Sequence, residues 1–188
     1  MTQIAIFASG TGSNAQKIME QVPGVALIVT NNPKAGVLDI AARHQVPTLV
    51  IEKERFFRGD AYLPGFQQKN IGLIVLAGFL WKVPVQLIKA YPQKIINIHP
   101  ALLPKYGGKG MYGHFVHEAV LAAGEKESGI SIHYVDELYD HGQVILQATC
   151  PVETGDTPES LAKKVQALEH RHFPGAVQLL ATSSAFAK

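Results

Sequence analysis

The sequence predicts one α/β domain built on a single open, mostly parallel sheet, with an antiparallel C-terminal extension and helices on both faces. Two observations support this fold class. Short apolar runs alternate with helical segments over the first 100 residues, at a spacing typical of right-handed strand–helix–strand crossovers. Two later apolar runs lie too close together for a crossover helix, so they must pair antiparallel.

Five strands are predicted in the first half, over residues 4–8, 25–30, 48–51, 71–77 and 94–98. The first is a continuous apolar run, which is typical of a strand covered on both faces. Helices are predicted over residues 13–21, 37–45 and 84–90, the last with a proline near its start. The polar stretch that ends at Gln68 receives no element of its own.

The second half begins with an amphipathic helix over residues 115–123, which Gly124 ends. Strands over residues 129–135 and 143–152 then flank a turn that contains Asp140. This arrangement predicts a hairpin at the edge of the parallel sheet.

The last helix carries clear capping signals, with Thr157 as the N-cap, Pro158 at the first helical position and Glu159 after it. No repeat, low-complexity tract or linker interrupts these elements. Residues 1–188 are therefore predicted to form one domain.

The composition argues against several classes of protein. Lys and Arg number 17 against 15 Asp and Glu, and a net charge of +2 is too balanced to predict a nucleic-acid-binding surface. The longest apolar stretch, residues 71–81, is too short to cross a bilayer, and the N-terminus lacks the basic start of a signal peptide. We therefore expect a cytoplasmic protein without membrane or nucleic-acid partners.

The single cysteine, Cys150, excludes an intramolecular disulfide and suits a reducing compartment. It ends an apolar run, where a cysteine usually packs as a small hydrophobic residue, although a nucleophilic role stays open. No Cys/His pair has the spacing of a metal site. The histidines without ligand-like pairing are His114, His117, His141, His170 and His172.

A glycine-rich loop, residues 8–14 with the sequence ASGTGSN, joins the first strand to the first helix. Its glycines allow a tight turn, and the free N–H groups at the helix start point toward an anion. No Gly-Lys-Ser/Thr follows, which argues against a P-loop, and Ala15 replaces the third glycine of a dinucleotide fingerprint. The alternatives are an anion site and a turn whose glycines only relieve strain.

Polar side chains also gather at the end of the fifth strand. Alternation places Asn97 and His99 on the same side, near the carboxyl end of a parallel strand, where open α/β sheets bind ligands. An imidazole can transfer a proton and an amide can hold an oxyanion, but capping of loop backbone groups is an equal alternative. Asp140 would complete a site for acyl transfer, although periodicity does not bring it near His99.

Two further positions have alternatives of their own. His133 lies on the strand before the Asp140 turn, either as a buried hydrogen-bonded histidine or in a supporting role. Glu169 and His170 lie near the end of the last helix. They form a solvated face unless that helix packs across the ligand crevice.

The chain resembles the phosphoribosylglycinamide formyltransferase family over nearly its whole length. The block Asn97-Ile98-His99-Pro100-Ala101-Leu102-Leu103-Pro104 is specific to the wider formyltransferase superfamily, and the glycine-rich loop narrows it to the branch whose acceptor carries a phosphate. The other matching motifs are Leu76-Ala77-Gly78-Phe79, Asp140-His141-Gly142-Gln143-Val144-Ile145, and Glu169-His170 with Pro174 nearby.

The resemblance implies a Rossmann- or flavodoxin-like domain that uses 10-formyltetrahydrofolate as co-substrate and glycinamide ribonucleotide as acceptor in purine biosynthesis, without a metal. It also implies that Asn97, His99 and Asp140 are the catalytic residues. The acceptor amine would attack the formyl carbon directly, and Asn97 and protonated His99 would stabilise the oxyanion. Asp140 would raise the pKa of His99 and relay a proton through water.

Two binding regions follow from the same resemblance. The acceptor phosphate and ribose are expected at Thr11, Gly12, Ser13, Asn14, Gly78, Gln166 and Glu169. The folate is expected along Leu80, Trp81, Lys82 and Val83, and against Tyr134, Val135, Asp136, Glu137, Leu138 and Tyr139. About residues 1–100 would serve the phosphate substrate and about residues 101–188 the folate side, in a monomer or weak homodimer.

The chain departs from the family pattern in a longer glycine-rich stretch within residues 105–115, in Trp81 and in His141. Two rival functions stay open and a third is disfavoured. A formyltetrahydrofolate hydrolase would use the same catalytic residues with water as acceptor, and typically carries an N-terminal regulatory domain. A methionyl-tRNA formyltransferase would need a C-terminal RNA-binding domain and a basic surface, and the chain is expected to have neither. A nucleotide-binding module without chemistry would leave Asn97, His99 and Asp140 unexplained.

Overall fold

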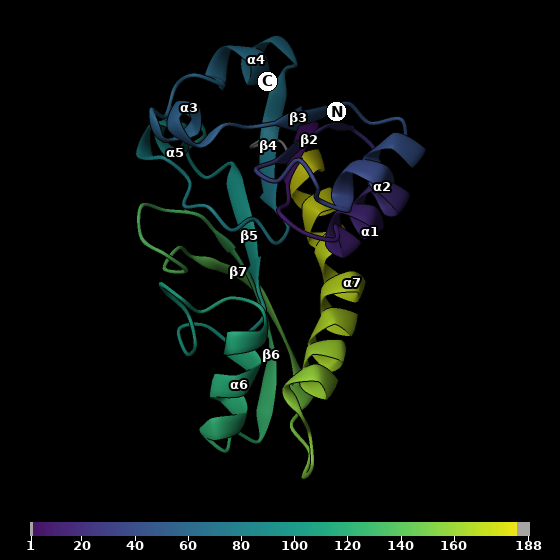
Figure 1. The fold of residues 1–188 in the computed structure, drawn as a ribbon, viewed down its shortest axis with the longest axis vertical. Helices are drawn as coiled ribbons and strands as arrows, with labels where there is room; N and C mark the ends of the chain where they lie inside the picture. Colours follow the sequence, from purple (N-terminus) through teal and green to yellow (C-terminus); the bar gives the residue numbers. More distant parts are fainter. Residues whose placement is uncertain (1, 184–188) are drawn as a thin grey trace.

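The computed structural model describes residues 2–183; Met1 and residues 184–188, at the ends of the predicted domain, lie outside the described residues. Seven strands form one sheet in the order β3-β2-β1-β4-β5-β6-β7 (Figure 1). The first five pair in parallel, whereas β6 pairs antiparallel with both β5 and β7. The strands are β1 (Gln3–Phe7), β2 (Val25–Thr30), β3 (Thr48–Val50), β4 (Ile71–Leu76), β5 (Ile95–His99), β6 (Glu127–Tyr134) and β7 (Val144–Pro151). The predicted fold class is confirmed.

Seven helices surround the sheet in the described part of the chain. They are α1 (Ser13–Gln21), α2 (Val37–Arg43), α3 (Lys53–Phe57), α4 (Leu63–Gln68), α5 (Val85–Ala90), α6 (His114–Ala122) and α7 (Pro158–Thr182). The short helices α3 and α4 lie in the polar stretch to which the sequence assigns no element, so that expectation is wrong there. Each of them is anchored by one aromatic side chain that is almost fully buried, Phe56 in α3 and Phe66 in α4.

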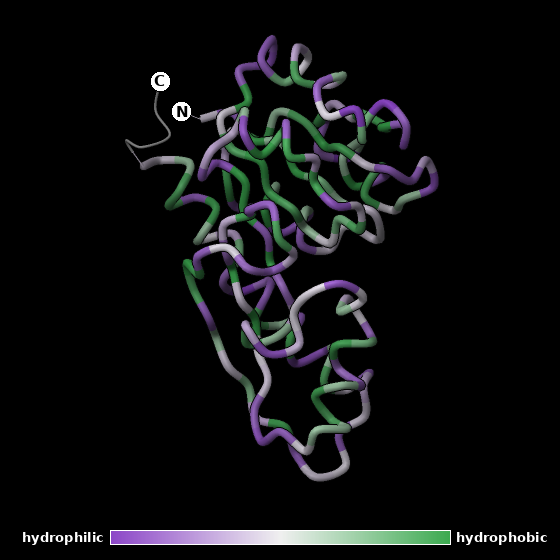
Figure 2. The backbone as a smooth tube through the Cα atoms, turned by 90° about the vertical axis from the view of Figure 1, so that its left-hand side faces the viewer, coloured by the Kyte–Doolittle hydropathy of each residue, from purple (hydrophilic) through white to green (hydrophobic). Residues whose placement is uncertain are grey.

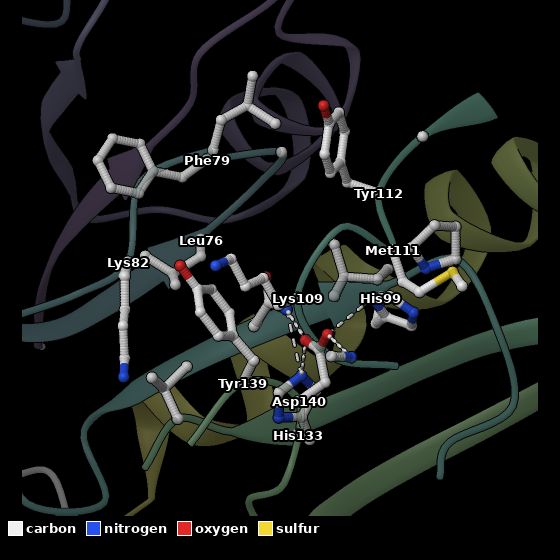
Figure 3. Close-up of a pocket in the computed structure, with 18 of the residues that line it drawn as sticks. Leu76, Phe79, Lys82, His99, Lys109, Met111, Tyr112, His133, Tyr139 and Asp140 are labelled. Atoms are coloured by element: carbon white, nitrogen blue, oxygen red, sulfur yellow. Dashed lines mark hydrogen bonds and ion pairs between the residues drawn. The ribbon is translucent and has the colours of Figure 1, made fainter. Parts of the chain in front are cut away.

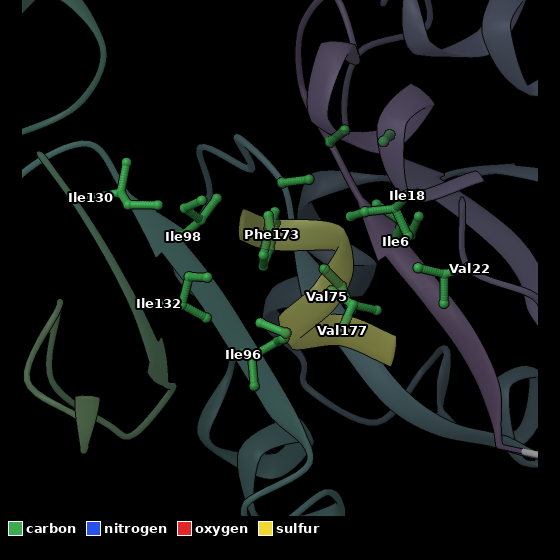
Figure 4. Packing of buried hydrophobic residues seen from close by; sticks show 14 of the residues in the cluster. Ile6, Ile18, Val22, Val75, Ile96, Ile98, Ile130, Ile132, Phe173 and Val177 are labelled. Atoms are coloured by element: carbon green, nitrogen blue, oxygen red, sulfur yellow. The ribbon is translucent and has the colours of Figure 1, made fainter. Parts of the chain in front are cut away.

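The strands bury alternate side chains on two faces of the sheet, as period-2 alternation requires. Ile4 and Ile6 of β1 pack in the cluster covered by α1, α2, α6 and α7, part of which Figure 4 shows. Ala5 and Phe7 point to the opposite face, where α3, α4 and α5 cover the sheet. Helices therefore cover both faces. In Figure 2 many hydrophobic segments lie in the interior of the trace, and many hydrophilic ones lie in its outer turns.

The helix α7 begins where the capping signals predict. The Thr157 side chain accepts a hydrogen bond from the Ser160 N–H, and Ser160 Oγ accepts one from the Thr157 N–H, which forms a capping box. The helix packs along α1 and α6 and brings its middle turns beside the glycine-rich loop. Within residues 2–183, no helix is long and apolar enough to cross a bilayer.

Candidate active site

A cavity of about 660 Å³ opens at the carboxyl ends of β4 and β5. It lies beside the point where the strand order reverses around β1, which is where open α/β sheets bind ligands. Its volume falls in the range of about 300–1,000 Å³ that is typical of small-molecule sites. His99, Asp140 and His133 line it (Figure 3). Asn97 lines it as well.

The imidazole of His99 and the carboxylate of Asp140 meet in this cavity. His99 ends β5, and Asp140 lies in the turn between β6 and β7. The distance from His99 Nδ1 to Asp140 Oδ2 is 3.6 Å, and the two side chains are 5% and 12% exposed. The structure thus brings together the two groups that sequence periodicity leaves apart.

The other nitrogen of the His99 ring has a different partner. Nε2 lies 2.7 Å from the carbonyl oxygen of Tyr106. A carbonyl oxygen only accepts hydrogen bonds, so Nε2 carries a hydrogen and Nδ1 of the neutral ring presents a lone pair to Asp140. A second proton on His99 must therefore bind at Nδ1, next to the carboxylate.

The pKa of His99 is lowered from its ordinary value of 6.5 because burial disfavours the charged ring. Asp140 acts in the opposite direction, as expected from its negative charge, and so does the Tyr106 carbonyl. Burial outweighs both effects. Without substrate, the neutral form of His99 is thus favoured more strongly than the resemblance implies.

Asp140 is held by several neighbours. Its φ of 53° is the left-handed conformation, which Asp tolerates better than most residues. The Gly108 N–H donates to its Oδ2 at 3.0 Å. Burial alone would raise the pKa of Asp140, but His133, His99 and the Gly108 N–H together hold it below its ordinary value. The group is therefore a carboxylate at neutral pH.

A glycine makes the Asp140 turn possible. A Cβ atom added at Gly142 would overlap the carbonyl oxygen of Tyr134. The two strands can approach closely only because no side chain is present there. This close approach lies in the turn that carries Asp140, two residues before β7 begins.

Asn97 and His133 form the other side of the cluster. His133 is almost fully buried, and its Nδ1 lies 2.8 Å from the carbonyl oxygen of Tyr134, so Nδ1 carries a hydrogen. Nε2 of His133 lies 3.1 Å from Asn97 Nδ2 and 3.5 Å from Asp140 Oδ1. In the neutral ring, this nitrogen accepts from the Asn97 amide. His133 thus supports the position of Asn97.

The glycine-rich loop reaches the same cavity at one end. Asn14 lines the cavity and donates through Nδ2 to Glu169 Oε2 at 2.8 Å. Gln166 and Glu169 of α7 also line it, and Gln166 Nε2 donates to Ser13 Oγ at 3.2 Å. Thr11, Gly12 and Ser13 are not among the residues that line the cavity. The alternative in which α7 packs across the crevice is therefore the one observed for Glu169.

Most residues expected on the folate side line the cavity as well. These are Leu80, Trp81, Lys82, Val83, Val135, Asp136, Leu138 and Tyr139, with Gly78 of the acceptor side next to them. Tyr134 and Glu137 do not line it. Trp81 packs against Phe56 and Phe57 of α3, with ring centroids 5.9 and 5.6 Å apart.

Several lining residues are not among the predicted contacts. Phe79, which belongs to one of the matching motifs, and His117 line the cavity. Residues 108–113, including Met111 and Tyr112, also line it, and they belong to the long glycine-rich stretch that the family resemblance puts beside the folate. His117 is buried in α6, and its Nδ1 has no hydrogen-bond partner. Its position on the apolar side of an amphipathic helix is the only sequence signal that could have indicated it. Among the described residues, no group of three or more His, Cys, Asp or Glu side chains could hold a metal ion.

Comparison with known proteins gives a consistent result. Residues 2–177 match the formyl transferase family. The chain is 42% identical over 182 residues to the chloroplastic phosphoribosylglycinamide formyltransferase of Arabidopsis thaliana, covering 91% of this chain and 62% of that protein. It is 37% identical over 188 residues to the protein of the same name from Vigna unguiculata, covering 95% and 60%. The chain thus spans about three fifths of the length of these curated relatives.

A solved structure matches the whole chain. The crystal structure of phosphoribosylglycinamide formyltransferase from Bacillus halodurans is 35% identical in sequence, with a TM-score of 0.89 and full coverage of both chains. The described part of the chain therefore has the same fold as that protein. The chain belongs to the formyl transferase family, in its phosphoribosylglycinamide formyltransferase branch.

Proposed function

We propose that this protein transfers the formyl group of 10-formyltetrahydrofolate to the primary amine of glycinamide ribonucleotide in purine biosynthesis. One observation carries the proposal: Asn97, His99 and Asp140 converge in a single cavity. None of the described residues that line this cavity is Ser, Thr or Cys. Direct attack by the acceptor amine, without a hydroxyl or thiol nucleophile from the protein, suits this lining.

The acceptor binds, in this proposal, at the glycine-rich loop. The phosphate contacts Thr11, Gly12, Ser13 and Asn14 at the start of α1, where free N–H groups and the helix dipole favour an anion. Glu169 lies beside the loop, and burial raises the pKa of its carboxyl group. In this proposal the carboxyl group of Glu169, the Gln166 side chain and the main chain at Gly78 contact the ribose and the glycinamide arm. All three residues line the cavity, which supports this assignment.

The folate binds along residues 80–83 and against residues 134–139. Apolar and aromatic side chains in these segments suit a flat heterocycle, and the polar cluster at Asp140 lines the same cavity. The division into residues 1–100 for the phosphate substrate and 101–188 for the folate is approximate. The helix α7 also serves the acceptor side through Gln166 and Glu169.

The chemistry assigned to these residues is electrostatic. The acceptor nitrogen forms a bond to the formyl carbon, and the carbonyl electron pair moves to the oxygen. His99, protonated at Nδ1, and the amide of Asn97 donate hydrogen bonds to that oxygen. Asp140 accepts the proton lost by the acceptor nitrogen, through water. When the carbon–nitrogen bond to the folate breaks, the leaving nitrogen receives this same proton from Asp140, again through water, so the reaction is balanced.

This assignment requires a rearrangement of Asn97. Its amide nitrogen lies 3.1 Å from His133 Nε2 and 3.4 Å from Asp140 Oδ1, so both hydrogens point to protein acceptors. The amide must release at least one of these to reach an oxyanion. A negative oxygen is a stronger acceptor than a neutral imidazole, so the exchange is favourable when charge develops.

A two-substrate assay tests the proposal. Purified protein is expected to release tetrahydrofolate only when both substrates are present, with an equal amount of formylated acceptor. Release without the acceptor would indicate a formyltetrahydrofolate hydrolase instead. Binding of both compounds without product would indicate a binding module.

We also propose that the protein works in the cytoplasm as a monomer or weak homodimer, without a metal. The lone thiol of Cys150 is compatible with a reducing compartment. The His99, Asn97 and Asp140 groups supply the polarisation that a Lewis acid would otherwise provide. Undiminished activity after dialysis against EDTA, a sedimentation profile dominated by one chain and a cytoplasmic signal from a tagged protein are the expected results.

A further inference from the structure

Ser9 lies between the two halves of the proposed substrate site without lining the cavity itself. It follows β1 and is 6% exposed. The proposed phosphate loop begins two residues later, at Thr11, and the proposed folate segment begins at Leu80. A buried hydroxyl in this position needs hydrogen-bond partners, and those partners show what it connects.

The hydroxyl group bridges two strand ends. Ser9 Oγ donates to Asn31 Oδ1 at 2.6 Å and accepts the Leu80 N–H at 2.9 Å. A hydroxyl group has one hydrogen, so the short bond to Asn31 directs the lone pairs of Oγ toward Leu80. The Ser9 hydroxyl group thus holds the Leu80 main chain beside Asn31.

The main chain of Ser9 adds to the same connection. Its N–H donates to the Gly78 carbonyl at 3.1 Å, and its carbonyl accepts from Asn32 Nδ2 at 3.4 Å. Ser9 therefore binds the segment 78–80 at two points, one on each side of Phe79. Gly78 adopts a φ of +75°, so the chain turns sharply between β4 and the part that Ser9 holds.

We propose that Ser9 is a positioning residue that couples the acceptor site to the folate site, an inference that rests on the proposed function. A phosphate that orders the loop after Ser9 also orders Leu80 through the Ser9 hydroxyl, and a folate along residues 80–83 orders the loop in return. Such coupling is reciprocal, because each ligand must change the affinity of the other by the same factor.

The test measures this factor with a pair of ligands that cannot react. Tetrahydrofolate lacks the formyl group, so the affinity for glycinamide ribonucleotide can be titrated with and without saturating tetrahydrofolate. The wild-type ratio of the two dissociation constants is expected to be about fivefold or more. In Ser9→Ala the ratio falls to about one, because the connection to Leu80 is lost.

A matched control and a second variant separate coupling from folding. Ser128 is 2% exposed and its Oγ has no hydrogen-bond partner, so Ser128→Ala removes a buried hydroxyl group that connects nothing. It should keep the wild-type ratio. Asn31→Ala leaves the Ser9 hydroxyl without its acceptor and should lower the ratio in the same direction, with no further loss in the double variant.

The outcomes distinguish this inference from the proposed function. A wild-type protein that forms formylated acceptor but shows no coupling, or a Ser9→Ala variant that keeps the wild-type ratio, overturns the role of Ser9 alone. A Ser9→Ala variant that loses acceptor affinity but keeps the ratio also overturns it, since Ser9 would then only support the loop. A wild-type protein that forms no product overturns the proposed function and this inference together.

Discussion

His99 presents Nδ1 to Asp140 Oδ2 at 3.6 Å while its Nε2 is occupied by the Tyr106 carbonyl at 2.7 Å. The ring cannot offer its other nitrogen to the carboxylate without losing that bond. Any proton that His99 gains or loses is therefore exchanged at Nδ1, on the cavity side. Burial lowers the pKa of His99 and the Asp140 carboxylate raises it. Small changes around the pair should therefore alter how readily His99 is protonated, and with it the reaction rate.

Removing either member of the pair should reduce turnover without preventing binding. His99→Ala and Asp140→Asn are each expected to lower kcat by at least about 10²-fold, because each removes stabilisation that arises only in the transition state. The dissociation constant for glycinamide ribonucleotide should change by less than about threefold, because its phosphate binds elsewhere. Steady-state kinetics and calorimetric titration measure the two quantities.

A neighbour in the same turn provides the control for this pair. His141→Ala alters an exposed side chain next to Asp140 and should keep near-normal rates. If His99→Ala and Asp140→Asn also kept near-normal rates, the assignment of the catalytic residues would have to be abandoned.

The pKa of His99 gives a prediction for pH dependence. Burial lowers it below 6.5, so the folded protein binds fewer protons there than the unfolded chain does. This contribution to the free energy of unfolding is present above 6.5 and is lost as the pH falls through 6.5 toward the folded pKa. By NMR, the His99 midpoint should lie below 6.5 and move lower still in Asp140→Asn, which removes the charge that opposes burial.

A His99 midpoint above 6.5, or an upward movement in Asp140→Asn, would show that burial does not dominate. His99 would then be protonated without bound substrates and ready to stabilise the oxyanion.

Sequence patterns predict most of the sheet because its strands are continuous apolar runs bounded by turn residues. β4 is expected over residues 71–77 and forms over Ile71–Leu76. The same patterns do not reveal α3 and α4. These helices are too short for a period to be detected, and buried aromatic side chains rather than propensity hold them in place.

The site is predictable only in parts. The alternation of β5 correctly places Asn97 and His99 together, because both lie on one strand. No pattern within one strand indicates Asp140 or Glu169, since the approach of Asp140 depends on the hairpin and that of Glu169 on the packing of α7 against α1. The family resemblance identifies Asp140 and Glu169 as site residues, and the packing of the hairpin and of α7 explains why they reach the cavity.

Gly12 should be essential to acceptor binding for a steric reason. Its φ is +82°, and an added Cβ would lie 2.7 Å from the Val37 side chain and 2.8 Å from the Val37 Cα atom. Gly12→Val should therefore displace the loop. The affinity for glycinamide ribonucleotide should fall by at least about tenfold, with little change in the affinity for folate. Gly10→Ala is the control, because nothing lies within 4 Å of a Cβ there. A selective folate defect in Gly12→Val would mean that the two pockets are assigned the wrong way round.

Lys82 should recognise the glutamate carboxylates of the folate. Its ammonium group lies 5.3 Å above the Tyr139 ring, and both residues line the cavity (Figure 3). Lys82→Gln should lower the affinity for 10-formyltetrahydrofolate about two- to fivefold, since exposed ion pairs contribute about 0.2–1 kcal/mol. The affinity should also depend less on salt concentration. Lys89→Gln changes an exposed lysine of α5 outside the cavity and should have no effect. Equal losses in both variants would indicate a general effect of charge and exclude a specific contact.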